Sequence, residues 1–138
     1  MSVSLTRQVA FRASHQLRLP DLSEAQNRAR FGWTSDPHEH DYTCAATVSG
    51  TPEPGTGMIV DLALLDRILA EQVVLPLDGR HLNDAVPECA RGSVLPVCEV
   101  LAAWCYRRIA AHLPASVRLE RVRVAEDPTL HADCTGTS

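Results

Sequence analysis

"SDPHEHDYTCAATVSG", residues 35–50, is the stretch that decides the fold expected for this chain. Successive side chains of a β-strand point to opposite faces, so every second residue from His38 to Val48 would lie on one face. That face begins with two imidazoles, His38 and His40, and then turns apolar. We therefore expect a half-buried strand over residues 41–50, with the two histidines at its head.

Patterns on either side of this stretch indicate further strands and two helices. Residues 3–12 alternate like a second strand, and "SGTPEPGTG", residues 49–57, is typical of a turn. Asp61 is expected to cap a first helix, and residues 95–114 to form a second helix with Pro96 in its first turn. A last strand is expected over residues 118–127, where Glu126 shares a face with apolar residues. The inward positions are predicted to be Leu62, Leu65, Ile68, Leu69 and Val73 in the first helix and Val97, Val100, Leu101, Trp104 and Cys105 in the second.

The order of strand, strand, helix, helix and strand favours an α+β fold with helices covering one face of an antiparallel sheet. A length of 138 residues suits a single domain over residues 1–138. The formal charge of −4, with no basic stripe longer than Arg107 and Arg108, argues against a nucleic-acid partner. No apolar stretch approaches the length of a membrane span, and the N-terminus lacks a leader pattern, so we expect a soluble, cytoplasmic protein without a membrane partner.

Cysteine and lysine usage narrows the chemistry. The chain has 5 cysteines, an odd number, and no C-x-x-C pair, which argues against disulfides and against a thiolate zinc knuckle. All 13 basic residues are arginine. Schiff-base chemistry through a lysine is therefore excluded.

Two histidines spaced at i and i+2 of a strand point the same way and could bind one cation. Catalytic zinc commonly takes three protein ligands, and His15, four residues after Phe11, would project to the same side if its strand continues that far. The alternative is that His38 and His40 are exposed or hydrogen-bonded histidines without a metal. Spacing alone leaves both interpretations open.

Six segments fall in the order seen in one enzyme family: "FRASHQL" (11–17), "DLSEAQNRARFGW" (21–33), "HEHDYT" (38–43), "GTGMIVDLALLD" (55–66), "PLDGRHLND" (76–84) and "VRVAED" (122–127). The chain thereby resembles 6-pyruvoyl-tetrahydropterin synthase and its bacterial relative 6-carboxy-tetrahydropterin synthase. The resemblance implies the tunnelling fold, in which each subunit gives a four-stranded antiparallel sheet with two helices on one face. Subunits of that fold close into an oligomeric barrel, a trimer or a homo-hexamer made as a dimer of trimers, with sites at the interfaces. It also implies a zinc cofactor bound by His15, His38 and His40.

The chain departs from the family where the family carries out proton transfer. The resemblance implies a catalytic cysteine before the H-x-H and a histidine after the aspartate of "PLD", yet these positions hold Thr34 and Gly79. A threonine hydroxyl is far too weak an acid to replace a thiolate, and glycine has no side chain to titrate. Asp78 remains, and a turn could bring His81 beside it as an acid/base pair, unless His81 is simply a surface residue.

The substrate end of the pattern is better preserved. The resemblance implies that Glu126 anchors a pterin ring, because one carboxylate accepts two parallel N–H donors. Glu99 matches a glutamate at the start of the family's second helix, although the preceding hydroxyl residues appear as Val97 and Cys98. We predict that Glu126, Glu99 and Thr34 contact substrate, the alternative for Glu126 being a surface residue at the end of a strand.

These observations predict a zinc-dependent lyase or cyclase of this family that acts on a pterin-like or other small polyhydroxylated or carbonyl substrate. Its acid/base set is rearranged, with Asp78 and His81 as candidates, which suits a specialised biosynthetic pathway. Ordinary 6-pyruvoyl- or 6-carboxy-tetrahydropterin synthase activity is one alternative. A catalytically inactive metal- or pterin-binding scaffold is the other.

Overall fold

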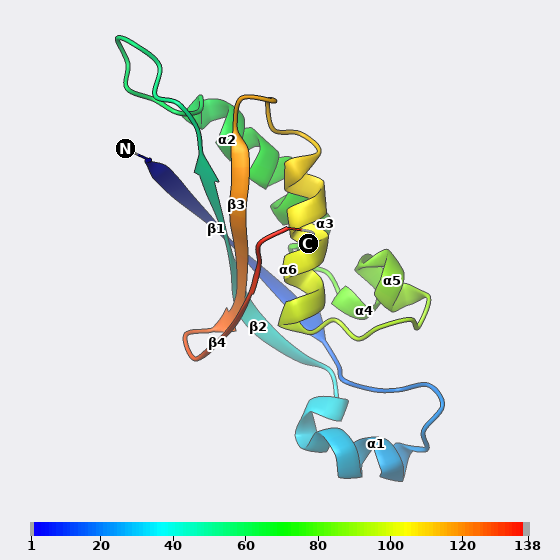
Figure 1. Ribbon diagram of the computed structural model, residues 1–138. Coiled ribbons are helices and arrows are strands. Elements are labelled where there is room, and N and C mark those ends of the chain that lie inside the picture. Colours follow the sequence, from blue (N-terminus) through cyan, green and yellow to red (C-terminus); the bar gives the residue numbers. More distant parts are fainter. Residues whose placement is uncertain (1, 137–138) are drawn as a thin grey trace.

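The central strand of the fold is β2, His38–Ser49, in a computed structural model that describes residues 2–136 (Figure 1). The sheet has four strands in the order β1-β2-β3-β4, and every neighbouring pair is antiparallel. The other strands are β1, Ser4–His15, β3, Arg118–Asp127, and β4, Leu130–Cys134. The predicted α+β class and four-stranded antiparallel sheet are confirmed.

The register between β1 and β2 brings the three candidate ligands together. His15 pairs with His38, Ala13 with His40 and Phe11 with Tyr42, so both strands end where the histidines lie. The strand expected over residues 41–50 begins three residues earlier, and the strand expected over residues 3–12 continues to His15. His15 therefore shares the buried face with Phe11, as the alternation of a continued strand requires.

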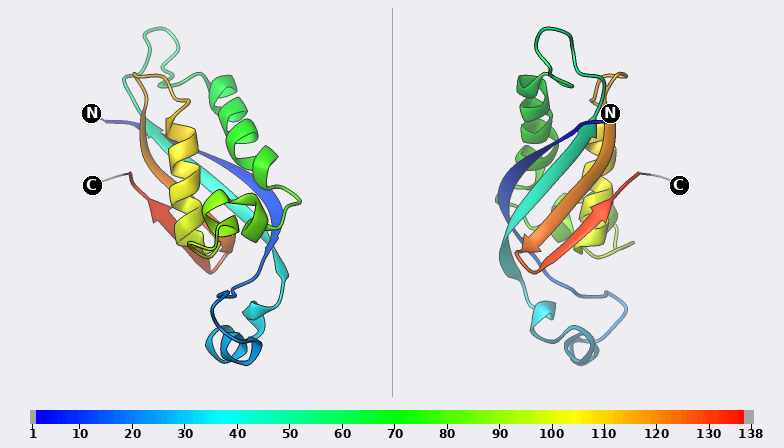
Figure 2. Two further views of the ribbon diagram at one scale, coloured as in Figure 1. Left: turned by 90° about the vertical axis from the view of Figure 1, so that its right-hand side faces the viewer. Right: turned by 60° about the vertical axis from the view of Figure 1, so that its left-hand side comes forward.

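Helices cover only one face of the sheet (Figure 2). The helix α2, Leu62–Leu69, begins at the predicted cap Asp61, whose side chain accepts from the backbone N–H of Ala63. It continues through a π-helical turn, Ala70–Val74, into α3, Leu75–Leu77. The short helices α4, Leu82–Ala85, and α5, Pro87–Ala90, lead to the longer α6, Cys98–Ala110. Pro96 lies before α6 and not in its first turn as predicted, because Val97 is the N-cap.

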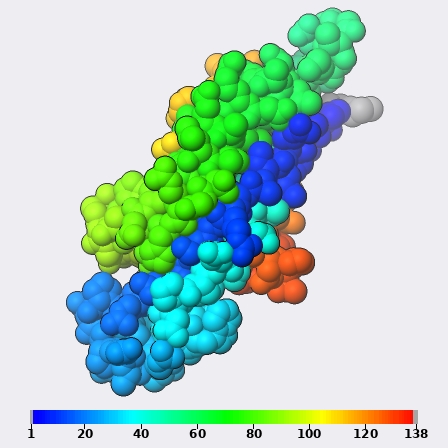
Figure 3. Space-filling view, turned by 180° about the vertical axis from the view of Figure 1, so that it is seen from behind, coloured from blue at the N-terminus to red at the C-terminus, as the bar shows by residue number. Residues whose placement is uncertain are grey.

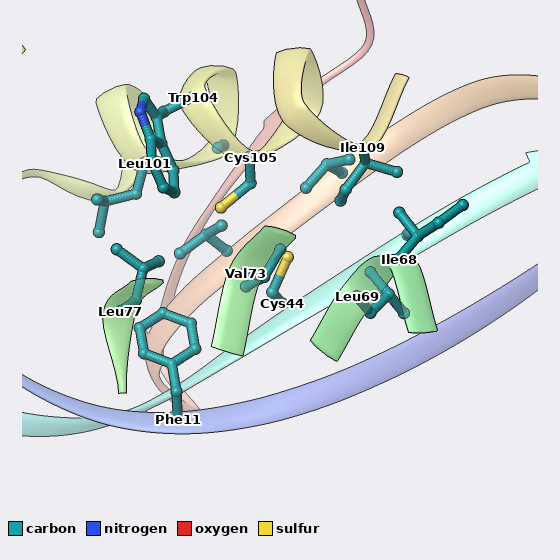
Figure 4. Close-up of a cluster of buried hydrophobic side chains, with 14 of the residues drawn as sticks. Phe11, Cys44, Ile68, Leu69, Val73, Leu77, Leu101, Trp104, Cys105 and Ile109 are labelled. Atoms are coloured by element: carbon teal, nitrogen blue, oxygen red, sulfur yellow. The ribbon is translucent and has the colours of Figure 1, made fainter. Parts of the chain in front are cut away.

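The hydrophobic core fills the space between this face and the helices α2 and α6 (Figure 4). The rings of Phe11 and Tyr42 stack with centroids 5.1 Å apart, and Cys44 faces the α6 residue Cys105 across the core. Each fully buried Leu or Val side chain contributes about 1.5–3 kcal/mol. The core therefore fixes the positions of β1 and β2 up to the point where the histidines begin.

The helix α1, Glu24–Phe31, has no counterpart in the predicted elements. It begins with a reciprocal pair of side-chain contacts between Ser23 and Gln26, and Asn27 is fully buried beneath the preceding loop. A 3-10 turn, Gly32–Ser35, then leads into β2. Residues 19–35, which we call the α1 lobe, and the 51–57 loop lie at opposite ends of the molecule (Figure 3). None of the helices within residues 2–136 is long and apolar enough to cross a membrane.

Candidate metal centre

Three histidines converge where β1 and β2 end on the helix-covered face. The ring centroids of His15 and His38 lie 4.5 Å apart, those of His15 and His40 5.1 Å, and those of His38 and His40 5.0 Å. One ring nitrogen of each histidine lies within 4.8 Å of a nitrogen of the other two, a spacing that could hold a metal ion. The rings meet edge to face, so they surround a point and do not stack.

Backbone carbonyls fix the orientation of two of these rings. Nδ1 of His15 lies 2.8 Å from the carbonyl oxygen of Pro96, and Nδ1 of His38 lies 2.8 Å from the carbonyl oxygen of Asp36. A carbonyl only accepts, so each Nδ1 carries the proton and each Nε2 keeps its lone pair. This is the arrangement that metal-binding histidines commonly have.

Two of the Nε2 atoms are buried without a hydrogen-bond partner in the described part of the chain, those of His15 and His40. A buried polar atom without a partner costs about 1–3 kcal/mol, so native proteins rarely leave two of them side by side. A cation at the centre of the cluster would satisfy both atoms. The residues therefore fit a zinc site with three histidine ligands.

Burial also favours the neutral, metal-binding form of His15, which is 2% exposed. The pKa of His15 is lowered, mainly because burial removes the hydration of the charged ring. The nearby His38 and His40 lower the pKa further, and the hydrogen bond to the Pro96 carbonyl offsets part of this shift. The hydroxyl of Tyr42 lies 3.2 Å from Nδ1 of the same ring, and burial raises the pKa of Tyr42. Tyr42 therefore stays a neutral phenol at the floor of the cluster.

Glu126 lies beside the histidines, closer to them than the sequence indicated. Its Oε2 atom lies 2.9 Å from Nε2 of His40, outside hydrogen-bond geometry, so that nitrogen remains without a partner. Its Oε1 atom accepts from the thiol of Cys98, with 3.5 Å between Sγ and Oε1. Glu126, predicted to anchor substrate, thus lies within reach of both the cluster and the first residue of α6.

The structure places Asp78 and His81 along the outer edge of β1. Residues 79–81 bond to that edge, through Gly79 N–H to the Arg12 carbonyl and Ser14 N–H to the Arg80 carbonyl. Oδ1 of Asp78 accepts from the backbone N–H of Arg12, and Nδ1 of His81 lies 2.9 Å from the Ser14 hydroxyl. Ser14 faces away from His15 because neighbouring residues of a strand alternate. His81 therefore lies on the opposite side of β1 from the histidine cluster, and Asp78 lies at the edge of the strand. Asp78 contacts Arg12 and His81 contacts Ser14, so the structure does not pair Asp78 with His81.

Thr34 and Glu99 also occupy positions that the sequence did not specify. The Thr34 hydroxyl donates to the carbonyl of Phe31 within the turn that precedes β2. Glu99 is exposed in the first turn of α6, whereas its neighbour Cys98 is the residue that reaches Glu126. Nearby, the exposed Trp33 contacts His38 with ring centroids 4.8 Å apart, so the α1 lobe reaches the site.

Cys98 and the Pro96 carbonyl are the contacts that sequence reasoning missed. Cys98 is buried, and its thiol faces Glu126. The one available signal was its position beside Glu99 at the expected start of the second helix. A backbone carbonyl gives no signal in a sequence, because every residue has one.

The fold and site define a class: an α+β protein with helices on one face of a four-stranded antiparallel sheet and a three-histidine candidate metal centre at the end of two strands. The sequence model of the 6-pyruvoyl tetrahydropterin synthase family matches residues 4–137. The chain is 35% identical over 124 residues to the 6-pyruvoyl tetrahydrobiopterin synthases of Poecilia reticulata and Homo sapiens, covering 88% of this chain and 82% and 83% of those proteins. The solved structure of Caenorhabditis elegans 6-pyruvoyl tetrahydropterin synthase superposes with a TM-score of 0.86 at 26% identity, covering 99% of this chain and 97% of that one. The chain therefore belongs to the 6-pyruvoyl tetrahydropterin synthase family of lyases, and the predicted resemblance is confirmed.

Proposed function

We propose that this chain is a zinc-dependent lyase that acts on a pterin with a hydroxylated side chain. The observation that carries the proposal is the pair of buried Nε2 atoms without partners, on His15 and His40, in a cluster with His38. Three histidine ligands leave a fourth coordination position for substrate. When bound there, zinc supplies Lewis-acid chemistry, which acidifies a hydroxyl or the proton beside a carbonyl.

The residues of the chain would bind and orient the substrate around that position. Glu126 would accept two N–H donors from the amino-pyrimidine edge of a pterin, a charge-assisted pair that favours the carboxylate form. Its closeness to His40 would keep the anchored ring beside the histidines. Buried Tyr42 and the stacked Phe11 would close the site on the side of the hydrophobic core.

Proton transfer is the part of the reaction that must have changed. Thr34 donates its hydroxyl proton to a backbone carbonyl, and Gly79 offers no side chain, so neither serves as the family's relay. Asp78 and His81 remain the candidates, at the outer edge of β1 and away from the cluster of the same subunit. In an oligomeric assembly, these residues would act on the site of a neighbouring subunit. That assembly, a trimer or a homo-hexamer, is part of the proposal, and the cytoplasmic location stays a prediction.

The direct test is mass-spectrometric product analysis of the zinc-loaded protein with dihydroneopterin triphosphate. We expect turnover in the parent protein, loss of turnover in His38→Ala, and retention in His131→Ala, a matched change at an exposed histidine on β4. Loss of triphosphate with an intact carbon skeleton would identify ordinary synthase activity, and a shortened side chain would identify carbon–carbon cleavage. Absence of turnover in a zinc-loaded parent would contradict an activity on this substrate.

A scaffold without catalysis is the second candidate, and the occupied hydroxyl of Thr34 favours it. Thr34→Cys separates the two, because it places a thiol at the family's position for the catalytic cysteine. If the parent is inactive and Thr34→Cys gains turnover, the natural chain is a binding protein with an intact substrate site. If Thr34→Cys changes nothing in an active parent, the acid/base groups lie elsewhere, as the Asp78 and His81 assignment requires.

A further inference from the structure

The carboxylate of Glu126 is held between two different groups. Oε1 accepts from the thiol of Cys98 at 3.5 Å, while Oε2 lies 2.9 Å from Nε2 of His40. Tetrahedral zinc with bonds of about 2.0 Å places its ligand atoms roughly 3.3 Å apart. Oε2 is therefore already near the distance at which two ligands of one zinc ion stand from each other.

Glu126 could therefore bind the metal, and a Glu126 that bound the metal could no longer anchor substrate. Glu126, Asp127 and His40 also lie close enough together to hold a metal ion. A carboxylate that turned toward the histidines would fill the fourth coordination position and would no longer be free for substrate. The site works as proposed only if Glu126 is kept from turning further and binding the metal.

The start of α6 contacts both His15 of the candidate metal centre and Glu126. The Pro96 carbonyl accepts from Nδ1 of His15, and Cys98, the first residue of the helix, donates to Glu126. Cys98 is 3% exposed, so its side chain has little room for another orientation. One short buried segment thus fixes a candidate metal ligand and the candidate substrate anchor together.

We propose that Cys98 is a positioning residue whose S–H holds Oε1 of Glu126, so that the carboxylate stays beside the histidines without turning further to ligate the metal. The inference rests on the proposed function, because it requires a metal at the histidine cluster. Burial, and then the charge of Glu126, raise the pKa of the Cys98 thiol to about 12, so the thiol keeps the proton that it donates. A thiol is a weak donor, and it needs only to favour one of two nearby carboxylate orientations.

The test uses Co²⁺ as the probe in place of zinc, because its visible absorption spectrum reports its ligands. We expect Cys98→Ala to change the Co²⁺ spectrum and to raise Co²⁺ affinity by roughly tenfold, the size of effect that outer partners of metal ligands have. Cys98→Ser keeps a donor and should keep the parent spectrum. The double variant Cys98→Ala/Glu126→Gln should also return toward the parent spectrum, because it lacks the carboxylate that would bind the metal.

A second readout follows substrate binding. Quenching of the fluorescence of pterin itself, 2-amino-4-oxopteridine, should show about tenfold weaker binding to Co²⁺-loaded Cys98→Ala and unchanged binding to Cys98→Ser. Cys89→Ala is the matched control, because Cys89 is also a buried thiol but lies in α5. It should leave the spectrum and the pterin affinity as in the parent.

Two results would overturn the inference. One is a Cys98→Ala protein whose Co²⁺ spectrum equals that of the parent. The other is a changed spectrum that persists in the double variant, since Glu126 would then not be its cause. A parent protein that binds no Co²⁺ would instead overturn the proposed metal centre, and the role of Cys98 with it.

Discussion

Replacing His40 with leucine should stabilise the protein without metal and destabilise it, relative to the parent, when zinc is present. Nε2 of His40 is buried without a hydrogen-bond partner, which costs about 1–3 kcal/mol in the metal-free protein. The variant His40→Leu removes that atom and puts an apolar side chain of similar volume in its place. We therefore expect its free energy of unfolding in a chelator to equal or exceed that of the parent, by up to about 1 kcal/mol.

Zinc should reverse this order, because it binds only the folded parent with its three histidines. At a free zinc concentration of about 100 times the dissociation constant, linkage stabilises the parent by about 2.7 kcal/mol. For a domain of this size that corresponds to a rise in melting temperature of roughly 8–10 °C. The variant has lost a ligand and should gain much less.

The assay is urea unfolding of both proteins, once with EDTA and once with buffered zinc. His131→Leu serves as the control, because it removes an exposed histidine of β4 and should keep the full response to zinc. The reasoning fails if His40→Leu is less stable than the parent in EDTA, because removing an unsatisfied buried atom should not cost stability. It also fails if zinc does not stabilise the parent.

Three further changes test other parts of the structure. Asn27→Ala should lower the free energy of unfolding of the α1 lobe by about 1–3 kcal/mol, because Oδ1 of Asn27 accepts from the Leu19 N–H and its Nδ2 donates to the Leu19 carbonyl. Hydrogen exchange over residues 19–35 would measure this loss of stability. Asp78→Asn keeps an acceptor for the Arg12 N–H, so the free energy of unfolding should stay as in the parent. If Asp78 transfers a proton, turnover should fall by about 10²–10⁴-fold, and unchanged turnover would exclude that role. Burial and the charge of Glu88 raise the pKa of the Cys89 thiol to about 11. Above the ordinary thiol pKa, the unfolded chain therefore loses a proton that the folded chain keeps. The free energy of unfolding should fall as pH rises from about 9 to 11. Urea unfolding across that range should show a weaker fall for Cys89→Ala, and an equal fall would assign the effect to other groups.

The sequence predicted the central strand and the helix at Asp61 because both depend on local patterns. Alternation from Tyr42 to Val48 survives in the structure as a continuous buried face, and the carboxylate of Asp61 caps α2 as its position indicated. The helix α1 was missed because most of its residues are charged or carry amides, and its two alanines and Phe31 show no apolar period. Its stability comes from the caps at Ser23 and from the buried amide of Asn27, which contacts the loop before it. Such a helix depends on a few hydrogen bonds, and these leave little trace in a hydrophobic pattern.

The candidate ligands could be predicted because strand geometry alone brings them together. His38 and His40 share a face by alternation, and His15 reaches them through the register of β1 against β2. The groups that orient these rings could not be predicted, since two of them are the backbone carbonyls of Pro96 and Asp36. The contact between Cys98 and Glu126 could not be predicted for a related reason. Helical spacing indicates which residues turn inward, but at the first residue of a helix the inward direction leads to the end of β3, where Glu126 lies.

The histidines lie where one sheet face passes from solvent into the hydrophobic core, and this position decides how tightly the fold holds each part of the candidate site. Ligands on two paired strands are held by the whole β1–β2 ladder and by the stacked Phe11 and Tyr42 beneath them, so they cannot shift without disturbing the core. Thr34 and Gly79 lie outside the paired strands, on the turn that precedes β2 and on the loop after α3. Neither belongs to the hydrophobic core, so a different side chain at either position would leave the β1–β2 ladder and the stacked rings in place. The strands and the core thus constrain the candidate ligands more tightly than they constrain these two positions.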